Sequence, residues 1–294
     1  MGLRARLVDS ALVGFLVVFT NFDAVDRMVL PVDDYAALAA GLRMGKKKVG
    51  GVCPQVMPQV TPEMVGFEPD AFQRQLLETD ARQVILKCSR QWGKSSVTAL
   101  KTILVATGGA QRVVVVMSPS ARQSGEFLLK VKSFLAAAGM PKLPTDGVNP
   151  MSVLLPNGSR IVALPGVEAT MRGFSAVDLL VIDEAAQVRD EQYLAAGPML
   201  AVKNGALWVL STPYGARGFF WKEWEMGGEG WLRLEVKATD CPRLSAAFLE
   251  RERLRIGPDW YRQEYLCEFV GAEDGPFRDE LLQRAMASGV EKLF

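Results

Sequence analysis

The sequence contains no histidine among its 294 residues. This absence excludes a Ser-His-Asp triad, a histidine-ligated zinc site and an imidazole base, so any general base must be a carboxylate. Cysteine is also scarce: Cys53, Cys88, Cys241 and Cys267 are widely spaced, and none belongs to a C-x-x-C pair. This spacing is typical of buried free thiols in a reducing cytoplasm.

Net charge and long apolar runs are lacking as well. A formal charge of +1 gives no overall attraction to nucleic acid, so any contact with a polyanion must come from a local patch. The apolar run Ala11–Phe19 is too short to cross a bilayer, and no A-x-A cleavage site follows it. We expect a packed strand or helix there, with a signal or membrane anchor as the alternative. No membrane partner is expected.

What the sequence does contain is a phosphate-binding loop with one substitution. The Walker A pattern is G-x-x-x-x-G-K-[ST]. The segment from Cys88 to Ser95 satisfies it at Gly93, Lys94 and Ser95, but Cys88 occupies the place of the first glycine. Lys94 would reach the β- and γ-phosphates of a nucleotide and Ser95 would ligate Mg²⁺. The alternative is a chance G-K-S sequence in a strand–turn–helix.

Strands alternate with helices from residue 62 onward, which predicts an α/β fold with a mainly parallel β-sheet sandwiched by helices. We divide the chain into an N-terminal extension (1–60), the α/β domain (61–270) and a C-terminal tail (271–294). A hairpin is predicted over Ser152–Leu164, with a type I′ turn at Asn157 and Gly158. Strands are expected from Gln83 and over 112–117, 177–184 and 205–213, and helices over 69–78, 95–107, 127–138 and 219–224.

Two adjacent acids follow the buried run Leu179–Ile182. They fall at the carboxyl end of a predicted strand, where ligands of open α/β sheets bind. Asp183 is placed to hold Mg²⁺ through water, and Glu184 to orient and deprotonate an attacking water. The alternative is an ordinary strand followed by an acidic helix N-cap.

Taken together, these motifs resemble the ATPase domain of the large terminase subunit, the motor that packages double-stranded DNA into viral capsids. The loop Ser89–Ser95 is similar to the terminase form of Walker A, in which the first glycine is often missing. The segment Thr170–Ala185 resembles the family's Arg-Gly stretch running into Walker B, and Trp260–Val270 resembles the stretch that closes the ATPase region. The resemblance covers roughly residues 62 to 280 and implies a RecA-like P-loop fold of the ASCE type.

The resemblance also implies roles for individual residues, with ATP and Mg²⁺ as cofactors. Gln73 matches the glutamine that reads adenine, although it can equally lie on the polar face of its helix. Thr212, in Ser211–Pro213, belongs to a segment similar to the coupling motif beside the γ-phosphate; a simple turn is the alternative. The loop residues implied to contact nucleotide are Ser89, Arg90, Gln91, Trp92, Gly93, Lys94, Ser95 and Ser96.

Two arginines compete to neutralise charge in the transition state. Arg172, beside Gly173, is our preferred arginine finger, acting in trans from a neighbouring subunit of a ring. Arg90, inside the loop, would be a nucleotide or coupling contact. Either residue can instead be a surface salt-bridge residue.

The resemblance therefore implies an ATPase that translocates double-stranded DNA into a procapsid without reading its sequence. A homo-oligomeric ring, a portal protein and a small terminase subunit are the implied partners, in the host cytoplasm. Only residues 271–294 follow the closing stretch, so nuclease activity is not expected of this chain. The alternatives are a helicase-like DNA-dependent ATPase, disfavoured because a second RecA-like domain would not fit, and a nucleotide-gated assembly module with weak hydrolysis.

Overall fold

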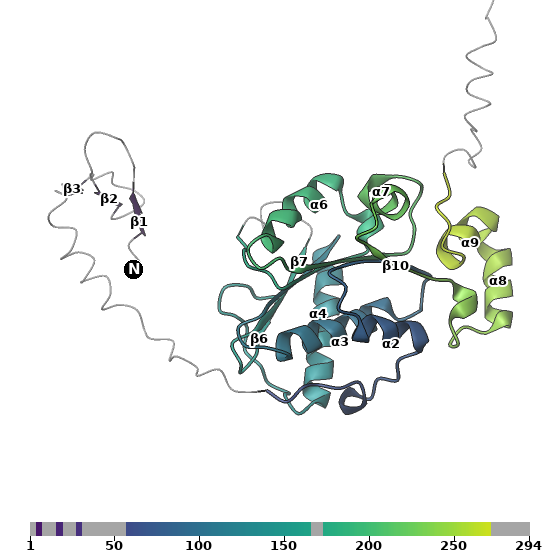
Figure 1. Ribbon diagram of the computed structural model, residues 1–294, viewed down its shortest axis with the longest axis horizontal. Coiled ribbons are helices and arrows are strands. Elements are labelled where there is room, and N and C mark those ends of the chain that lie inside the picture. The colour runs from purple at the N-terminus through teal and green to yellow at the C-terminus, as the bar shows by residue number, and fades with distance from the viewer. Residues whose placement is uncertain (1–3, 8–15, 20–27, 31–56, 166–172, 272–294) are drawn as a thin grey trace, which may run out of the picture. The chain divides into compact units, whose positions relative to one another are not determined.

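The computed structural model describes residues 57–165 and 173–271, together with the backbone of three short strands near the N-terminus (Figure 1). The chain divides into two compact units, Met1–Val52 and Cys53–Phe294. In the first unit, β1 (Arg4–Leu7), β2 (Leu16–Phe19) and β3 (Met28–Leu30) form an antiparallel sheet. The end of the apolar run Ala11–Phe19 is thus a strand, and its first residues lie outside the described part.

The second unit is built on a seven-stranded sheet in the order β10-β4-β9-β8-β5-β7-β6. Every neighbouring pair is parallel except β6 and β7, which confirms the predicted α/β class. The strands are β4 (Gln83–Cys88), β5 (Val113–Ser118), β6 (Ser152–Leu154), β7 (Arg160–Pro165), β8 (Leu179–Asp183), β9 (Ala206–Ser211) and β10 (Leu232–Val236).

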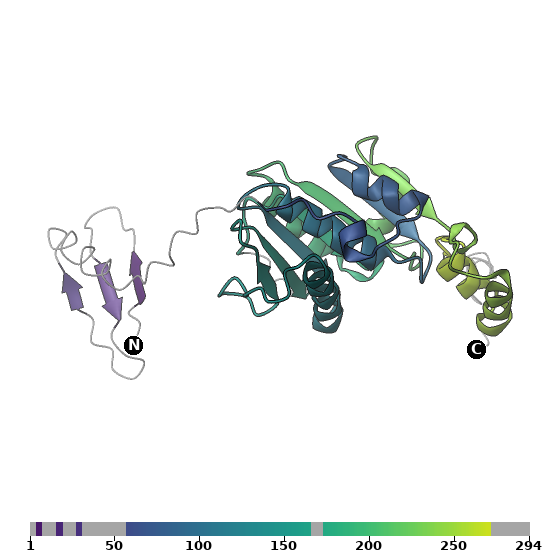
Figure 2. The ribbon, with the colours of Figure 1, turned by 90° about the horizontal axis from the view of Figure 1, so that it is seen from below.

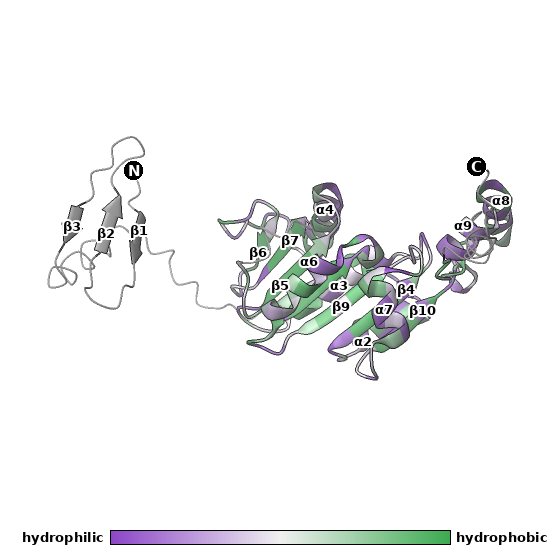
Figure 3. Ribbon diagram, turned by 90° about the horizontal axis from the view of Figure 1, so that it is seen from above, coloured by the Kyte–Doolittle hydropathy of each residue, from purple (hydrophilic) through white to green (hydrophobic). Residues whose placement is uncertain are grey.

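Helices cover both faces of this sheet, which explains why its central strands are continuous apolar runs (Figures 2 and 3). Alternate residues of a strand serve different layers: Val84 and Leu86 pack toward α3 and α4, whereas Ile85 packs toward α7. The helices are α2 (Ala71–Glu78), α3 (Lys94–Thr107), α4 (Ala121–Ala137), α6 (Asp190–Ala196), α7 (Gly218–Met226), α8 (Ala246–Ile256) and α9 (Pro258–Tyr265), with 3₁₀ turns η2 (Glu63–Val65), η3 (Ala185–Gln187), η4 (Gly197–Leu200) and η5 (Ala238–Asp240).

Two local predictions are wrong. The hairpin turn is not type I′, because that turn needs positive φ at both central residues and only Gly158 has it. Asn157 is instead buried, and its side-chain amide donates to the carbonyls of Ala106 and Gly109 at the end of α3. Helix α4 also starts at Ala121 rather than Phe127, because the Ser120 hydroxyl caps it by accepting from the Gln123 N–H at 3.3 Å.

Candidate nucleotide-binding site

The loop between β4 and α3 has the backbone that a phosphate cradle needs. Gln91 and Gly93 have φ of +63° and +97°, so the chain curls before α3 begins at Lys94. A Cβ built on Gly93 would lie 3.1 Å from Nε2 of Gln73. Both the left-handed backbone and the close side chain therefore require glycine at this position.

Cys88, which replaces the first Walker A glycine, is fully buried in the core beneath α3. Burial raises the pKa of its thiol to about 12, since the desolvation of a thiolate outweighs the attraction of the Lys94 ammonium. Cys241 and Cys267 are likewise buried free thiols, as predicted. Cys88 thus acts as a small apolar residue at the end of β4.

Four predicted residues, two from the start of α3 and two from the end of β8, meet in one cluster. The Lys94 ammonium donates to Oε1 of Glu184 at 2.5 Å, and the Ser95 hydroxyl approaches Oδ2 of Asp183 at 3.4 Å. The Lys94 and Glu184 side chains are 14% and 24% exposed. Glu184 has φ of +53°, an uncommon conformation for a residue with a side chain and one that is typical of functional sites.

The charges of this cluster perturb each other. Burial works to lower the pKa of the Lys94 ammonium, but the carboxylates of Asp183 and Glu184 outweigh it, so that the pKa is raised and the lysine stays charged. Burial raises the pKa of the Asp183 carboxyl despite the nearby Lys94. The site thus holds a buried cation beside two carboxylates, which is a place for anionic phosphate and a divalent cation.

The predicted coupling segment closes the same site. Ser211 ends β9, and its buried hydroxyl accepts from the N–H of Ala186 at 3.1 Å, two residues after Glu184. Thr212 follows it in the wall of a cavity of about 320 Å³. This cavity is lined by Arg90, Gln91, Lys94, Gln123, Glu184, Gln187, Thr212, Pro213, Tyr214 and Glu264.

Arg90 also lines this cavity and forms a two-pronged ion pair with Glu264 of α9 at 2.5 and 3.3 Å. Its side chain is 61% exposed, whereas that of Glu264 is 9% exposed. The hydrogen bonds that the Arg90 guanidinium donates to the Glu264 carboxylate raise the pKa of Arg90. Arg90 therefore joins the phosphate loop to the predicted closing stretch, a contact for which the sequence offered no partner.

Several other predicted contacts are turned away from the cavity. The side chains of Ser89 and Trp92 are buried, which leaves only their backbone to face a ligand. Gln73 is also buried; its amide donates to the Trp92 carbonyl at 3.0 Å and accepts from the Asp70 N–H at 3.1 Å. To read adenine, Gln73 would have to release those partners. Arg172 lies outside the described residues, so its role stays a prediction.

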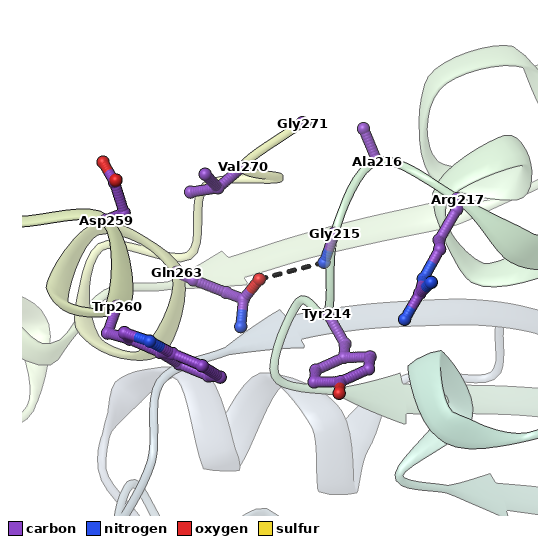
Figure 4. Close-up of a pocket in the computed structure, with 9 residues that line it drawn as sticks. All are labelled: Tyr214, Gly215, Ala216, Arg217, Asp259, Trp260, Gln263, Val270 and Gly271. Atoms are coloured by element: carbon purple, nitrogen blue, oxygen red, sulfur yellow. Dashed lines mark hydrogen bonds between the residues drawn. The ribbon is translucent and has the colours of Figure 1, made fainter. Parts of the chain in front are cut away.

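A second cavity, of about 410 Å³, opens beside the coupling segment (Figure 4). Its walls come from residues 214–217 after β9 and from α9 with the residues that follow it. The Gln263 amide oxygen accepts from the Gly215 N–H at 2.9 Å, and the Arg217 guanidinium lies 5.3 Å from the centre of the Tyr214 ring. Helix α9 is thereby tied both to the phosphate loop and to the segment after Thr212.

The donor chemistry of the cluster fits Mg²⁺. Ser95 and Asp183 offer hard oxygen donors that already approach each other. No group of three or more acidic, cysteine or histidine residues in the described ranges is arranged to enclose a metal by itself. Mg²⁺ typically takes one or two protein oxygens and completes its shell with phosphate and water, so this pair of ligands is suited to a metal that arrives with a nucleotide.

Fold and site together define a P-loop nucleotide-binding domain of RecA-like architecture. The phosphate loop joins the buried strand β4 to helix α3. The acidic strand β8 lies two positions from β4 in the sheet, and β9, which ends in hydroxyl residues, lies between β4 and β8. None of the helices in the described part of the chain combines the length and apolar character needed to span a bilayer.

Comparison with known proteins narrows the class. The family model "Terminase large subunit, T4likevirus-type, N-terminal" matches residues 85–284. A large terminase subunit of Thermus phage G20c is 26% identical over 258 residues, which cover 73% of this chain and 51% of that protein. The large terminase ATPase domain of Thermus phage P74-26 superposes with a TM-score of 0.62 at 17% identity, covering 73% of this chain and all of the domain.

The chain belongs to the large terminase subunit family and contains its N-terminal ATPase region. A further structural neighbour, the large terminase of another thermophilic bacteriophage in complex with ADP, has a TM-score of 0.59 at 15% identity and covers 68% of this chain and 53% of its own. The resemblance inferred from the sequence motifs is confirmed, as is the RecA-like fold. The chain spans about half the length of the phage relative it matches.

Proposed function

We propose that this chain is the ATP-hydrolysing motor domain of a terminase that moves double-stranded DNA into a procapsid. The observation that carries the proposal is the meeting of Lys94 and Ser95, at the start of α3, with Asp183 and Glu184, at the carboxyl end of β8. This arrangement supplies a lysine ammonium to bind phosphate, two oxygens to bind a metal and a carboxylate to act as base, in a chain of the terminase family.

In the proposed reaction, the ATP phosphates bind the Lys94 ammonium and so break its ion pair with Glu184. The freed Glu184 carboxylate orients a water molecule and accepts its proton as the water oxygen bonds to the γ-phosphorus. The bond from that phosphorus to the oxygen bridging the β-phosphate breaks, and ADP leaves with this oxygen. Ser95 and Asp183 would hold Mg²⁺, which would supply positive charge to neutralise the β- and γ-phosphates. Thr212 would sense the loss of the γ-phosphate through its hydroxyl; in support, it lines the cavity, and the Ser211 contact to Ala186 links that segment to the Glu184 turn.

The two arginines take separate roles in this proposal. Arg90 is a nucleotide or coupling contact, since it lines the cavity and is held by Glu264. Arg172 is the finger that acts in trans within a homo-oligomeric ring. Mixing Arg172→Ala subunits with Lys94→Ala subunits should restore part of the turnover that each variant lacks alone. No recovery in the mixture would count against a trans finger.

The partners follow from the same proposal. The motor would grip DNA backbone phosphates in the host cytoplasm, while docked through a portal protein on the procapsid and supplied with DNA by a small terminase subunit. A sequence-independent grip predicts binding that weakens steeply with salt.

The direct test is ATP turnover of the wild-type chain with and without double-stranded DNA and portal, beside Lys94→Ala. We expect wild-type turnover to rise with DNA. The Lys94→Ala variant should be inactive because it lacks the ammonium group that binds the phosphates. Control variant Lys203→Ala removes a lysine that pairs with Asp178 away from the site and should behave as wild type. Turnover that ignores DNA would favour a nucleotide-gated assembly module, and no turnover by the wild type would refute the proposal.

A further inference from the structure

Two side chains from outside the phosphate loop donate to one carbonyl within it. The Trp92 carbonyl accepts from Nε2 of Gln73 at 3.0 Å and also from Nη2 of Arg243. Gln73 belongs to α2, and Arg243 lies in the turn after η5, 151 residues beyond Trp92. A carbonyl has two lone pairs, and here both have protein donors before any nucleotide binds.

The two donors are themselves fixed by Asp70, the residue that caps α2. Oδ2 of Asp70 accepts from Nη2 of Arg243 at 3.0 Å, and Oδ1 accepts from the Gln73 N–H at 2.9 Å. The Gln73 side-chain carbonyl in turn accepts a hydrogen bond from the Asp70 N–H. The Asp70 side chain is 12% exposed, so the carboxylate that joins the two donors is largely sheltered from water, while the Arg243 side chain is 44% exposed.

This arrangement determines the direction of the next N–H group. The described peptide bonds are trans, and in a trans peptide the C=O and N–H point in opposite directions. Holding the Trp92 carbonyl toward Gln73 and Arg243 therefore turns the Gly93 N–H the other way. N–H groups at the start of the helix after a phosphate loop are the ones that bind phosphate oxygens.

We propose that Arg243, with Gln73, is a positioning residue that presents the Gly93 N–H to the nucleotide phosphates. The inference rests on the proposed function, because it assigns a role at the same nucleotide site. The other end of the loop is held by the Ser89 N–H, which donates to the Val236 carbonyl at 2.9 Å, and by the ion pair of Arg90 with Glu264. Arg243 and Gln73 thus fix the half of the loop in which Gly93 is the single glycine.

The test compares a ligand that has a base with one that has none. Calorimetric titration of the full chain with ATPγS and with inorganic tripolyphosphate measures both affinities for wild type, Arg243→Ala and Arg243→Lys. Arg253→Ala is the matched control: its side chain is 53% exposed against 44% for Arg243, and it pairs with Glu250 on α8. Thermal unfolding of each variant reports whether the fold is intact.

We expect Arg243→Ala to weaken both ligands by the same factor, about ten-fold, and to raise KM for ATP with little change in kcat. Arg243→Lys should recover most of the affinity, because one ammonium can donate to both the Trp92 carbonyl and Asp70. Arg253→Ala should not differ from wild type.

Three results would overturn the inference while leaving the proposed function intact. Unchanged affinity in a folded Arg243→Ala variant would remove its role. A loss for ATPγS alone would show that the network recognises the base, as predicted for Gln73. An equal loss in Arg253→Ala would indicate general destabilisation. Failure of the wild type to bind either ligand would instead refute the proposed function itself.

Discussion

Replacing Glu184 by glutamine should make the protein bind ATP more tightly while nearly abolishing hydrolysis. Without nucleotide, Glu184 pairs with Lys94 at 2.5 Å, and both side chains are mostly buried. ATP must break this pair to reach Lys94. The substitution keeps the shape of the side chain but removes the competing charge, so the nucleotide no longer has to displace it.

The magnitude follows from burial. Exposed ion pairs contribute about 0–1 kcal/mol, and breaking a fully buried pair costs about 3–5 kcal/mol. The Lys94 and Glu184 side chains are 14% and 24% exposed, and Asp183 also attracts Lys94, so the competition from Glu184 should amount to about 1–2 kcal/mol. ATP affinity should therefore rise about five- to thirty-fold. Turnover should fall about 10²- to 10⁴-fold, the usual contribution of a general base.

Calorimetry with ATPγS and steady-state ATPase rates are the assays, and Glu235→Gln is the matched control. It breaks another lysine–glutamate pair, Lys87 with Glu235 at 2.9 Å, whose lysine is 9% exposed and packs against Trp224 outside the cavity. The control should alter neither affinity nor rate. Equal turnover in wild type and Glu184→Gln would refute the base assignment, and unchanged affinity would refute the competition between Glu184 and phosphate.

Three further predictions concern Arg90 and Cys88 in the phosphate loop and Asp178 away from the site. Arg90→Ala should lower the free energy of unfolding by about 1–3 kcal/mol because it leaves the buried Glu264 carboxylate unpaired, and Glu264→Gln should cost less; equal losses in urea unfolding would contradict this asymmetry. Cys88→Gly, which restores the Walker A consensus, should lose about 1–3 kcal/mol from the core without improving ATP affinity; tighter binding would show that the cysteine is a defect. Burial works to raise the pKa of Asp178, but hydrogen bonds from Lys203, the Val113 N–H and Arg112 lower it overall. The contribution of Asp178 to the free energy of unfolding is therefore present above about pH 4 and is lost as pH falls through the folded-state pKa. Asp178→Asn should accordingly cost about 2 kcal/mol at pH 7 and less in acid; a difference that does not depend on pH would exclude this linkage.

The sheet and the reactive cluster were predictable because their signals are local. Each apolar run is followed within a few residues by chemical groups: Lys94 after the loop that follows β4, and Asp183 and Glu184 at the end of β8. The edge strand β10 was not predicted, although Leu232, Leu234 and Val236 alternate with Arg233 and Glu235 as in a strand with one buried face; pairing with β4 makes it part of the sheet.

What escaped prediction depends on contacts between distant parts of the chain. Arg243 reaches Trp92 across 151 residues, and Glu264 reaches Arg90 across 174. No local pattern marks either partner. Gln73 shows the same limit, since its sequence position fits a helix surface, whereas packing turns its amide inward onto the phosphate loop.

The position of β9 between β4 and β8 has a geometric consequence. Neighbouring strands lie about 4.8 Å apart, so one intervening strand separates the phosphate loop from the acidic strand by about 9.6 Å. That separation leaves a gap at the carboxyl ends of these strands, which Lys94 and Glu184 bridge, while Ser211 ends the strand between them and Thr212 lines the cavity. A phosphoryl group and a water molecule need such a gap, and a large side chain at the end of β9 would fill it. The small hydroxyl residues are thus required by the spacing of the sheet as much as by their chemistry.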